Sequence, residues 1–320
     1  MNYMTKRPHV SIGMPVYNGA NYMQEAIDSI LNQTYKDFEL IITDNDSDDE
    51  TQEICERYAD LDKRVRYYRN KDNIGAARNY NKVFYLSRGD YFKWVAHDDV
   101  LAPEILEEAV KILDERPEII AVQSEVKIIN RNSEVIENYV NHLHNMNSAS
   151  AANRYGDFLL ADHGCFDVFS LIRRDVLKQT KLHGSHLAAD RNLLAELALR
   201  GRFFKIPKYL FFIREHPSRS IRIGPQTPES RGFWFDPRNR GKRMYERPRL
   251  FVEYWKAIHR VKLPGKERRG AYKYLWVWFK KFKGSMLNDV ILFNPYANLL
   301  YRQYRGLKSL THKKAGITDN

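Results

Sequence analysis

The chain has 320 residues, of which 43% are hydrophobic and 29% charged, a balance typical of a folded globular protein rather than a disordered one. Two separated cysteines, Cys55 and Cys165, exclude a disulfide framework and a zinc-finger spacing. The N-terminal residues lack the apolar core of a signal peptide, and no stretch reaches the roughly 18 apolar residues of a membrane span. We therefore expect a cytoplasmic protein.

The net charge of +12 is unevenly distributed. Residues 221–320 contain 23 Lys and Arg against 7 Asp and Glu, whereas residues 1–220 contain 29 against 33. Because the excess positive charge lies in the last third, we predict two parts with different roles, residues 1–220 and residues 221–320.

Short apolar runs alternate with helical patterns through the first hundred residues. We expect strands at His9–Met14, Phe38–Ile42, Val65–Tyr68 and Tyr91–Ala96, and helices at Asn21–Asn32, Asp48–Asp60 and Ala76–Ser87. Ser47 followed by Glu50 predicts a capping box for the second helix. A strand–helix unit of about 30 residues, repeated, is typical of βαβ crossovers and predicts an α/β fold with a mainly parallel sheet flanked by helices.

The pattern continues less regularly after residue 100. We expect a helix at Pro103–Asp114, a strand at Ile119–Ile129, a polar stretch to about Asn153, a strand at Val168–Ile172, an amphipathic helix at Asp190–Arg200 closed by Gly201, and strands at Phe203–Ile206 and Leu210–Arg214. Residues 221–249 indicate a long loop, and two or three helices are expected from Phe251 onward.

Polar loops follow each of the first four predicted strands: Pro15–Gly19, Thr43–Asp49, Asn70–Gly75 and His97–Asp99. Because the carboxyl ends of parallel strands meet at one edge of a sheet, these loops can converge on a single site. Adjacent carboxylates at such an edge suit Mg²⁺ or Mn²⁺ bound together with substrate phosphates. The structural alternative for the Asp98–Asp99 pair is a cap for the helix that follows. A glycine-rich dinucleotide fingerprint and a Walker loop are both absent from the sequence.

Three ordered motifs then carry a resemblance: PVYNGANYMQEAIDSILNQTYKDFELIITDNDSDDET, NIGAARNYN and KWVAHDDVLAPEIL. Over about residues 8–220 the chain resembles an inverting family 2 glycosyltransferase with a GT-A fold. The resemblance implies a Rossmann-like nucleotide-sugar-binding and catalytic domain in residues 1–220, followed by a basic, aromatic-rich loop and helical appendage in residues 221–320. It also implies a nucleotide-sugar donor, usually a uridine one.

The resemblance implies nucleotide contacts from Pro15, Tyr17, Asn18, Asp44, Asn73, Arg78 and Asp98. Tyr17 would flank the base, Asp44 would bind the pyrimidine edge, and Arg78 would close over the base or diphosphate. His97-Asp98-Asp99 occupies the Asp-x-Asp position of the family, with His97 in place of the first carboxylate. Asp98 would contact the ribose or the donor sugar.

The same resemblance implies the metal ligands and the base. Asp99 would bind Mn²⁺ or Mg²⁺ between the two phosphates. Arg214–Ser220 resembles the Arg-x-His-x-x-Ser segment of the family, so His216 would complete the metal shell or touch phosphate, although a structural histidine is the alternative. Asp190 is the expected general base, without the acid that often precedes it and with a helix N-cap as its alternative. Asp167 would meet the acceptor, whereas Cys165 is expected to be a small buried residue.

The C-terminal part interleaves aromatic residues with Lys and Arg, which suits a helix lying at an anionic membrane surface. A solvated charged face and a nucleic-acid surface are alternatives, and we expect no nucleic acid because no such motif is present. Together these features predict a metal-dependent inverting transferase acting on a saccharide or lipid-linked acceptor in surface polysaccharide biosynthesis, peripheral on the inner face of the membrane. A nucleotidyltransferase and a non-catalytic nucleotide-sugar-binding protein are the rival hypotheses.

Overall fold

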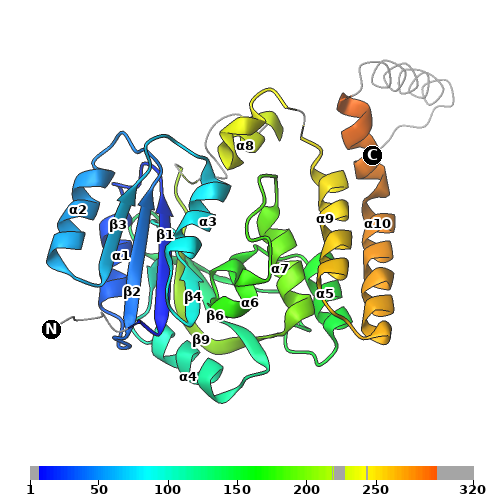
Figure 1. Ribbon diagram of the computed structural model, residues 1–320, viewed down its shortest axis with the longest axis horizontal. Helices are drawn as coiled ribbons and strands as arrows, with labels where there is room; N and C mark the ends of the chain where they lie inside the picture. The colour runs from blue at the N-terminus through cyan, green and yellow to red at the C-terminus, as the bar shows by residue number, and fades with distance from the viewer. Residues whose placement is uncertain (1–6, 218, 220–227, 243, 294–320) are drawn as a thin grey trace.

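The computed structural model describes residues 7–217, 219, 228–242 and 244–293. Its N-terminal half is a parallel βαβ array in which the strands lie in the order β3-β2-β1-β4 (Figure 1). Every residue of β1 and β2 is buried, as expected for parallel strands covered on both faces by helices. The elements of this half are β1 (Val10–Val16), α1 (Met23–Leu31), β2 (Phe38–Asp44), α2 (Thr51–Leu61), β3 (Val65–Arg69), α3 (Ala76–Leu86) and β4 (Tyr91–Trp94).

The sheet continues from β4 through an antiparallel strand, in the order β4-β8-β6-β9-β5, with β7 paired to β6. Because β8 is antiparallel to both β4 and β6, and β9 is parallel to β6, six of the nine strands among the described residues point in one direction. The elements of this half are β5 (Val100–Leu101), α4 (Ile105–Glu115), β6 (Ile119–Ile129), β7 (Val135–Tyr139), α5 (Ala151–Leu160), η1 (Phe166–Phe169), β8 (Leu171–Arg173), α6 (Arg174–Lys178), α7 (Ala189–Arg200) and β9 (Arg202–Arg214).

The C-terminal helices pack against the sheet domain rather than standing apart from it. Helices α9 (Glu246–Arg260) and α10 (Gly265–Phe293) lie beside α5 and α7 (Figure 1), and these four helices share one apolar cluster that includes Tyr155, Leu199, Tyr254 and Trp278. The approach of α10 to α5 is close, since a Cβ on Gly156 would lie 2.3 Å from the Tyr274 ring. No helix among the described residues is both long and apolar enough to cross a membrane.

Two expectations about strands were wrong. The two short strands predicted between Phe203 and Arg214 are one strand, β9, whose register against β6 shifts where Ser124 pairs with Ile206 and Glu125 with Tyr209. This bulge accommodates Pro207, which lacks the N–H needed for a regular ladder. The strand predicted at Val168–Ile172 begins as the 3₁₀ helix η1 and becomes β8 only at Leu171.

The helical expectations also required corrections. Helix α7 is buried on nearly all sides rather than amphipathic, because α5 and α9 cover the face opposite the sheet. The loop expected at residues 221–249 contains α8 (Pro228–Phe235), η2 (Pro237–Asn239) and the start of α9, while residues 220–227 lie outside the described part. The capping box is absent, since the Ser47 hydroxyl donates to Asp44 and Asp49 instead accepts from the Thr51 amide at 3.1 Å.

Candidate active site

The loops after β1 and β2 are fastened to each other at the carboxyl edge of the sheet. The Asn18 amide donates to the Ser47 hydroxyl at 2.9 Å, and the Asp48 amide donates to the Asn18 carbonyl oxygen Oδ1 at 3.1 Å. Asn18 has a left-handed backbone, with φ of 52°, which its short polar side chain tolerates. Pro15, the next-to-last residue of β1, lies opposite Thr43, and Tyr17 beyond it is 46% exposed. Tyr17 is therefore accessible to a ligand.

Asp44 ends β2 with its carboxylate completely buried and fully hydrogen-bonded. One oxygen accepts from the Ser47 amide at 2.9 Å and hydroxyl at 2.6 Å, and the other accepts from the Tyr67 hydroxyl at 2.9 Å and from Arg69 at 2.7 Å. Burial and the bond to Asp44 raise the pKa of Tyr67. Asp44 thus orders its own loop, and the contact with a pyrimidine stays a prediction.

Four asparagines connect the loops after β2 and β3 to helix α3. Asn73 Oδ1 accepts from Asn45 Nδ2 at 2.9 Å, and Asn45 Oδ1 in turn accepts from Asn70 at 2.9 Å. Asn79 donates to the Thr43 carbonyl at 2.8 Å and accepts from Asn70 at 3.1 Å. Of these four asparagines, only Asn73 was predicted as a site residue. The signal available in the sequence was the presence of asparagines in the loops after the predicted strands.

Arg78 lies on the first turns of α3 and is exposed. It makes no hydrogen bond or ion pair with any residue that the structure describes, so its guanidinium is available to an anionic ligand at this edge.

Asp98 and Asp99 lie just beyond β4 and are 8% and 6% exposed. His216 Nε2 and Asp98 Oδ2 are 2.9 Å apart, and the Asp99 carboxylate accepts from the Arg214 amide at 3.1 Å. The end of β9 therefore holds both carboxylates. This contact makes the simple helix-cap interpretation of the pair insufficient, since neither side chain caps α4, whose N-cap is Glu104.

Arg214 is a site residue whose partners the sequence did not reveal. Its side chain is completely buried; Nε donates to the Asp98 carbonyl at 2.9 Å, and the terminal nitrogens reach Ser133 at 2.9 Å and Glu25 at 2.6 Å. The guanidinium also lies 4.7 Å from the centre of the Tyr22 ring. Because these partners come from α1, β4 and the β6–β7 turn, Arg214 joins three separate elements beneath the site.

The two adjacent carboxylates have opposite pKa shifts. Burial, followed by repulsion from Asp98, raises the pKa of Asp99 to about 8. Burial alone would raise the pKa of Asp98 as well, but the hydrogen bond from His216 and the charges of nearby basic groups hold it below its usual range. The negative charge of Asp99 is therefore the less compensated one, and Arg219 is a nearby basic group that acts on both carboxylates.

Few protein groups around Asp98 and Asp99 could bind a metal ion. Among the described residues, no set of three or more His, Cys, Asp and Glu is arranged to hold an ion. His216, predicted to complete a metal shell, has its Nε2 engaged by Asp98. Mg²⁺ is commonly held by one or two carboxylates plus the phosphates of a substrate, so an uncompensated Asp99 fits such an ion only together with its ligand.

Asp190 lies in the first turn of α7, and the N-cap of that helix is Ala188, so the N-cap alternative for Asp190 was wrong. Ala188 has a left-handed backbone with φ of 53°, which turns the chain sharply into the helix. Burial raises the pKa of Tyr80, and the negative charges of Asp98, Asp99 and Asp190 raise it further. The charges of all three carboxylates thus act on one phenol although Asp190 is about 90 residues away in sequence.

Asp167 lies beneath the surface rather than on it. It is 1% exposed; Oδ2 accepts from Asn141 at 3.2 Å, and Oδ1 is buried with no hydrogen-bond partner among the described residues. Burial raises its pKa to about 6. Cys165, two residues earlier, is a buried free thiol whose pKa is raised by burial and by Asp190, as expected for an inert cysteine.

Lys93 was not predicted as a site residue, although a lysine inside an otherwise apolar strand could have indicated one. Its side chain is buried, its ammonium donates to the Phe169 carbonyl, and it lies 5.1 Å from the centre of the Phe211 ring. Burial lowers its pKa to about 7, against the opposing charge of Asp99. Lys93 therefore contributes positive potential below the Asp98–Asp99 pair.

Comparison with known proteins gives the family to which this chain belongs. The family model for glycosyl transferase family 2 matches residues 11–180, more than half of the chain. The chain therefore belongs to glycosyl transferase family 2.

Curated relatives match over shorter lengths. An uncharacterized glycosyltransferase of Rickettsia typhi is 44% identical over 114 residues, which are 36% of this chain and 35% of the relative. One from Methanocaldococcus jannaschii is 34% identical over 135 residues, 42% and 47% of the two chains. GlyG of Streptococcus pneumoniae is 32% identical over 107 residues, 33% and 36% of the two chains. The matches thus span between about a third and a half of these relatives.

Solved structures support the GT-A fold. Residues 1–349 of S. aureus TarS with UDP-GlcNAc superpose with a TM-score of 0.62 at 16% identity, covering 85% of this chain and 72% of that one. The mannosyltransferase PcManGT from Pyrobaculum calidifontis, with GDP-Man and Mn²⁺, gives a TM-score of 0.50 at 18% identity, covering 95% and 81%. At these identities the likeness establishes the fold alone.

Proposed function

We propose that the chain is a metal-dependent inverting glycosyltransferase that moves a sugar from a UDP-sugar to a saccharide or lipid-linked oligosaccharide in surface polysaccharide biosynthesis. The observation that carries this proposal is the pair of buried carboxylates, Asp98 and Asp99, held beyond β4 by the end of β9, with the charge of Asp190 acting on the same phenol, Tyr80, as theirs. Family membership supports the transferase chemistry, and the UDP-GlcNAc bound by TarS supports a uridine donor.

The proposed donor site uses the loops described above. Tyr17 and Arg78, both exposed, would contact the base and the diphosphate, while Asn18 and Asn73 hold their loops in place. Asp44 would bind the pyrimidine edge in exchange for one of the bonds that its buried carboxylate now accepts from Tyr67 and Arg69, and Asp98 would accept from the ribose or the donor sugar.

In the proposed transfer, the acceptor hydroxyl oxygen attacks the anomeric carbon of the donor from the face opposite the diphosphate. A carbon–oxygen bond to the acceptor forms, the bond between the anomeric carbon and the phosphate oxygen breaks, and the diphosphate leaves with the electron pair. Asp190 accepts the proton of the attacking hydroxyl. We assign this role to Asp190 because its charge acts on the same phenol as the charges of Asp98 and Asp99, and its carboxylate accepts from the neighbouring Arg191 amide at 2.8 Å.

A divalent ion, Mn²⁺ or Mg²⁺, would neutralise the diphosphate as it departs. Asp99 is the residue that would hold it, because its buried charge is the least compensated of the pair. His216 would act by orienting Asp98 and by reaching phosphate, since its Nε2 is already occupied. The Mn²⁺ bound to PcManGT supports this cofactor assignment.

The C-terminal helices would place the enzyme at the inner face of a membrane. Trp255 and Trp276 are 45% and 55% exposed on α9 and α10, and Lys280 lies 5.4 Å from the centre of the Trp276 ring. Exposed aromatic rings beside lysines suit an anionic headgroup layer. Trp278, by contrast, is buried against Tyr254, so only part of the aromatic stripe noted in the sequence is available. The proposed division at residue 220 separates two roles rather than two folding units, because residues from both parts pack in one apolar cluster.

A thermal-shift panel of nucleoside diphosphates with and without Mn²⁺ tests the proposal on wild type, Asp99→Ala and Asp190→Asn. A ligand at 100 times its Kd stabilises the native state by about 2.7 kcal/mol. We expect Mn²⁺-dependent stabilisation by UDP that is lost in Asp99→Ala and kept in Asp190→Asn, whose UDP-sugar turnover falls by 10²- to 10⁴-fold. Absence of any shift would refute the donor site, and binding without turnover in wild type would favour the non-catalytic binding protein.

A further inference from the structure

A tyrosine at the start of α1 packs between the two side chains that hold the acidic pair from the end of β9. The centre of the Tyr22 ring lies 4.7 Å from the Arg214 guanidinium and 4.7 Å from the centre of the His216 ring. Both contacts are made by the ring, and neither requires the hydroxyl. Tyr22 is half-buried and directly precedes α1, so the loop that follows β1 sets its position.

His216 relies on this ring more than Arg214 does. The Arg214 guanidinium is fixed by three hydrogen bonds of 2.6–2.9 Å to separate elements. Among the residues that the structure describes, the His216 side chain has one hydrogen bond, which joins Nε2 to Asp98 Oδ2 at 2.9 Å. A single bond of this kind leaves the imidazole free to tilt, and the Tyr22 ring, inclined at 58° to it, limits that tilt. Loss of the ring should therefore release the imidazole while Arg214 stays in place.

The loop that leads to Tyr22 also contacts His97, the imidazole that precedes Asp98 in the sequence. A Cβ on Gly19 would lie 2.9 Å from His97 Cδ2, closer than a real Cβ approaches, so the ring can lie there because residue 19 has no side chain. The Tyr22 amide donates to the Gly19 carbonyl at 3.3 Å, which closes a turn between the two contacts. One short loop thus packs against both His97 and His216.

This loop is also anchored to α2 and the residues before it, independently of the Tyr22 ring. The Gly19 amide donates to the Thr51 hydroxyl at 2.9 Å, and the Ala20 amide donates to Asp49 at 3.0 Å. These backbone bonds remain when the ring is removed. The residues proposed to contact the base should therefore keep their positions, and the effect of the ring should be confined to the diphosphate end of the site.

We propose that Tyr22 is a positioning residue, which holds the His216 imidazole against Asp98 so that the site accepts a diphosphate with its divalent ion. The inference rests on the proposed transferase function, because it takes a nucleoside diphosphate as the ligand. Tyr22 acts through His216, and the imidazole in turn orients the Asp98 carboxylate. Groups that orient a metal site in this way change its affinity by about 10- to 100-fold, and one ring contact accounts for about 3- to 10-fold.

The test is calorimetric titration of UDP and UMP, each with Mn²⁺, on wild type, Tyr22→Leu and Tyr22→Phe. UMP lacks the second phosphate, so it reports the base end of the site. Tyr22→Leu should weaken UDP binding about 3- to 10-fold and change UMP binding by less than about twofold. Tyr22→Phe retains both ring contacts and should restore the affinity for UDP. A loss in Tyr22→Phe equal to that in Tyr22→Leu would overturn the inference, because it would assign the effect to the hydroxyl.

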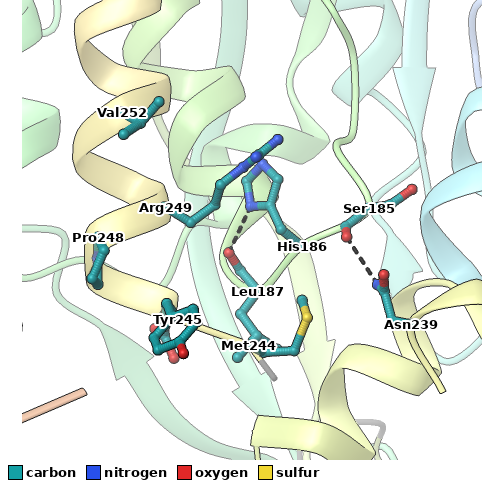
Figure 2. A pocket seen from close by; sticks show the side chains of 10 residues that line it. Ser185, His186, Leu187, Asn239, Met244, Tyr245, Pro248, Arg249 and Val252 are labelled. Carbon is teal, nitrogen blue, oxygen red and sulfur yellow. Dashed lines mark hydrogen bonds between the residues drawn. The ribbon is translucent and has the colours of Figure 1, made fainter. Parts of the chain in front are cut away.

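Tyr245 provides a matched control. Like Tyr22, it directly precedes a helix, α9, and its side chain does not cap that helix. It lines the cavity of about 610 Å³ between residues 185–187 and the start of α9 (Figure 2), to which neither Arg214 nor His216 contributes. Tyr245→Leu should therefore bind both nucleotides as the wild type does. An equal loss of UDP affinity in Tyr245→Leu and Tyr22→Leu would show a general packing effect and would contradict the positioning role.

A double variant shows whether Tyr22 acts through His216. If it does, adding Tyr22→Leu to His216→Gln should weaken UDP binding no further than His216→Gln alone. Additive losses, or an equal loss for UMP and UDP in Tyr22→Leu, would refute the inference.

The wild type separates the two proposals. Binding of UDP with Mn²⁺ that Tyr22→Leu leaves unchanged would remove the positioning role alone and leave the transferase proposal standing. If the wild type binds neither nucleotide, the transferase proposal fails, and the role of Tyr22 fails with it.

Discussion

Replacing Asp167 by Asn should stabilise the protein at neutral pH. The carboxyl group is 1% exposed, one oxygen has no partner, and burial raises its pKa to about 6 from about 3.9 in an unfolded chain. A shift of about two units corresponds to about 3 kcal/mol lost from the free energy of unfolding when the group is ionised. The new amide adds a buried N–H that costs about 1 kcal/mol or more, so we expect a net gain of about 1–2 kcal/mol at pH 7.5.

The difference in the free energy of unfolding between Asp167→Asn and wild type should depend on pH, with a sign that follows from the raised pKa of Asp167. Between about pH 4 and 6 the native state keeps the Asp167 proton while the unfolded chain releases it, so this contribution to stability falls as pH rises. The advantage of Asp167→Asn should therefore be absent near pH 4 and complete above pH 6.5. Urea unfolding of both proteins at four pH values measures it, because subtraction cancels the other titrating groups. A pH-independent difference, or an advantage that shrinks as pH rises, would refute the reasoning.

The same variant tests the predicted acceptor role. If Asp167 supports acceptor binding, Asp167→Asn raises the acceptor KM while it stabilises the fold and leaves UDP affinity unchanged. A gain in stability with an unchanged acceptor KM would make the residue purely structural and remove it from the site. This separation is possible because, in the described part of the chain, the side-chain hydrogen bond of Asp167 comes from Asn141 rather than from a residue of the proposed donor site.

Three further changes have definite expected outcomes. His216→Gln removes the imidazole that bonds to Asp98 and should weaken UDP–Mn²⁺ binding about 10- to 100-fold in calorimetric titration, and unchanged affinity would show that His216 does not orient Asp98. Gly75→Ala should lower the free energy of unfolding by about 1–3 kcal/mol, measured with urea, because Gly75 has φ of +83° and its Cβ would lie 2.7 Å from the Phe235 carbonyl. Lys93→Met should raise the free energy of unfolding most below pH 7, where the wild type buries a charged amine, and progressively less toward pH 9. A gain in the free energy of unfolding that grows with pH would contradict the lowered pKa of Lys93.

The N-terminal half could be predicted from the sequence because one physical constraint governs it. Strands covered by helices on both faces must be apolar throughout, and β1 and β2 are buried at every position. The second half obeys no such rule. Within the described part of the chain, strand β7 pairs along β6 alone and exposes Val135 and Ile136, so it shows no alternation of buried and exposed residues. The sequence pattern predicted two strands between Phe203 and Arg214, whereas a bulge keeps β9 continuous in the fold.

The candidate site was predictable where its residues follow strands, and not where it depends on distant partners. Asp98 and Asp99 were found because two charges end an apolar run. Their partners could not be assigned from local pattern, since the His216–Asp98 contact spans 118 residues and the Arg214–Glu25 ion pair spans 189. Such contacts arise from the pairing of β5 with β9, which brings the residues that follow β4 to the end of β9.

The charge balance of the site explains why nucleotide binding should require a cation. The negative charge of Asp98 is compensated by His216. Asp99 and Asp190 add two carboxylates near the place proposed for a diphosphate. Burial lowers the pKa of His97, which favours the neutral form of that imidazole. A diphosphate entering alone would face this negative potential, against which Arg78 is exposed on α3 and Arg219 acts on Asp98 and Asp99. An ion held by Asp99 and the phosphates together would relieve both the repulsion and the raised pKa of Asp99. Metal and nucleotide should therefore bind cooperatively, each weakly without the other.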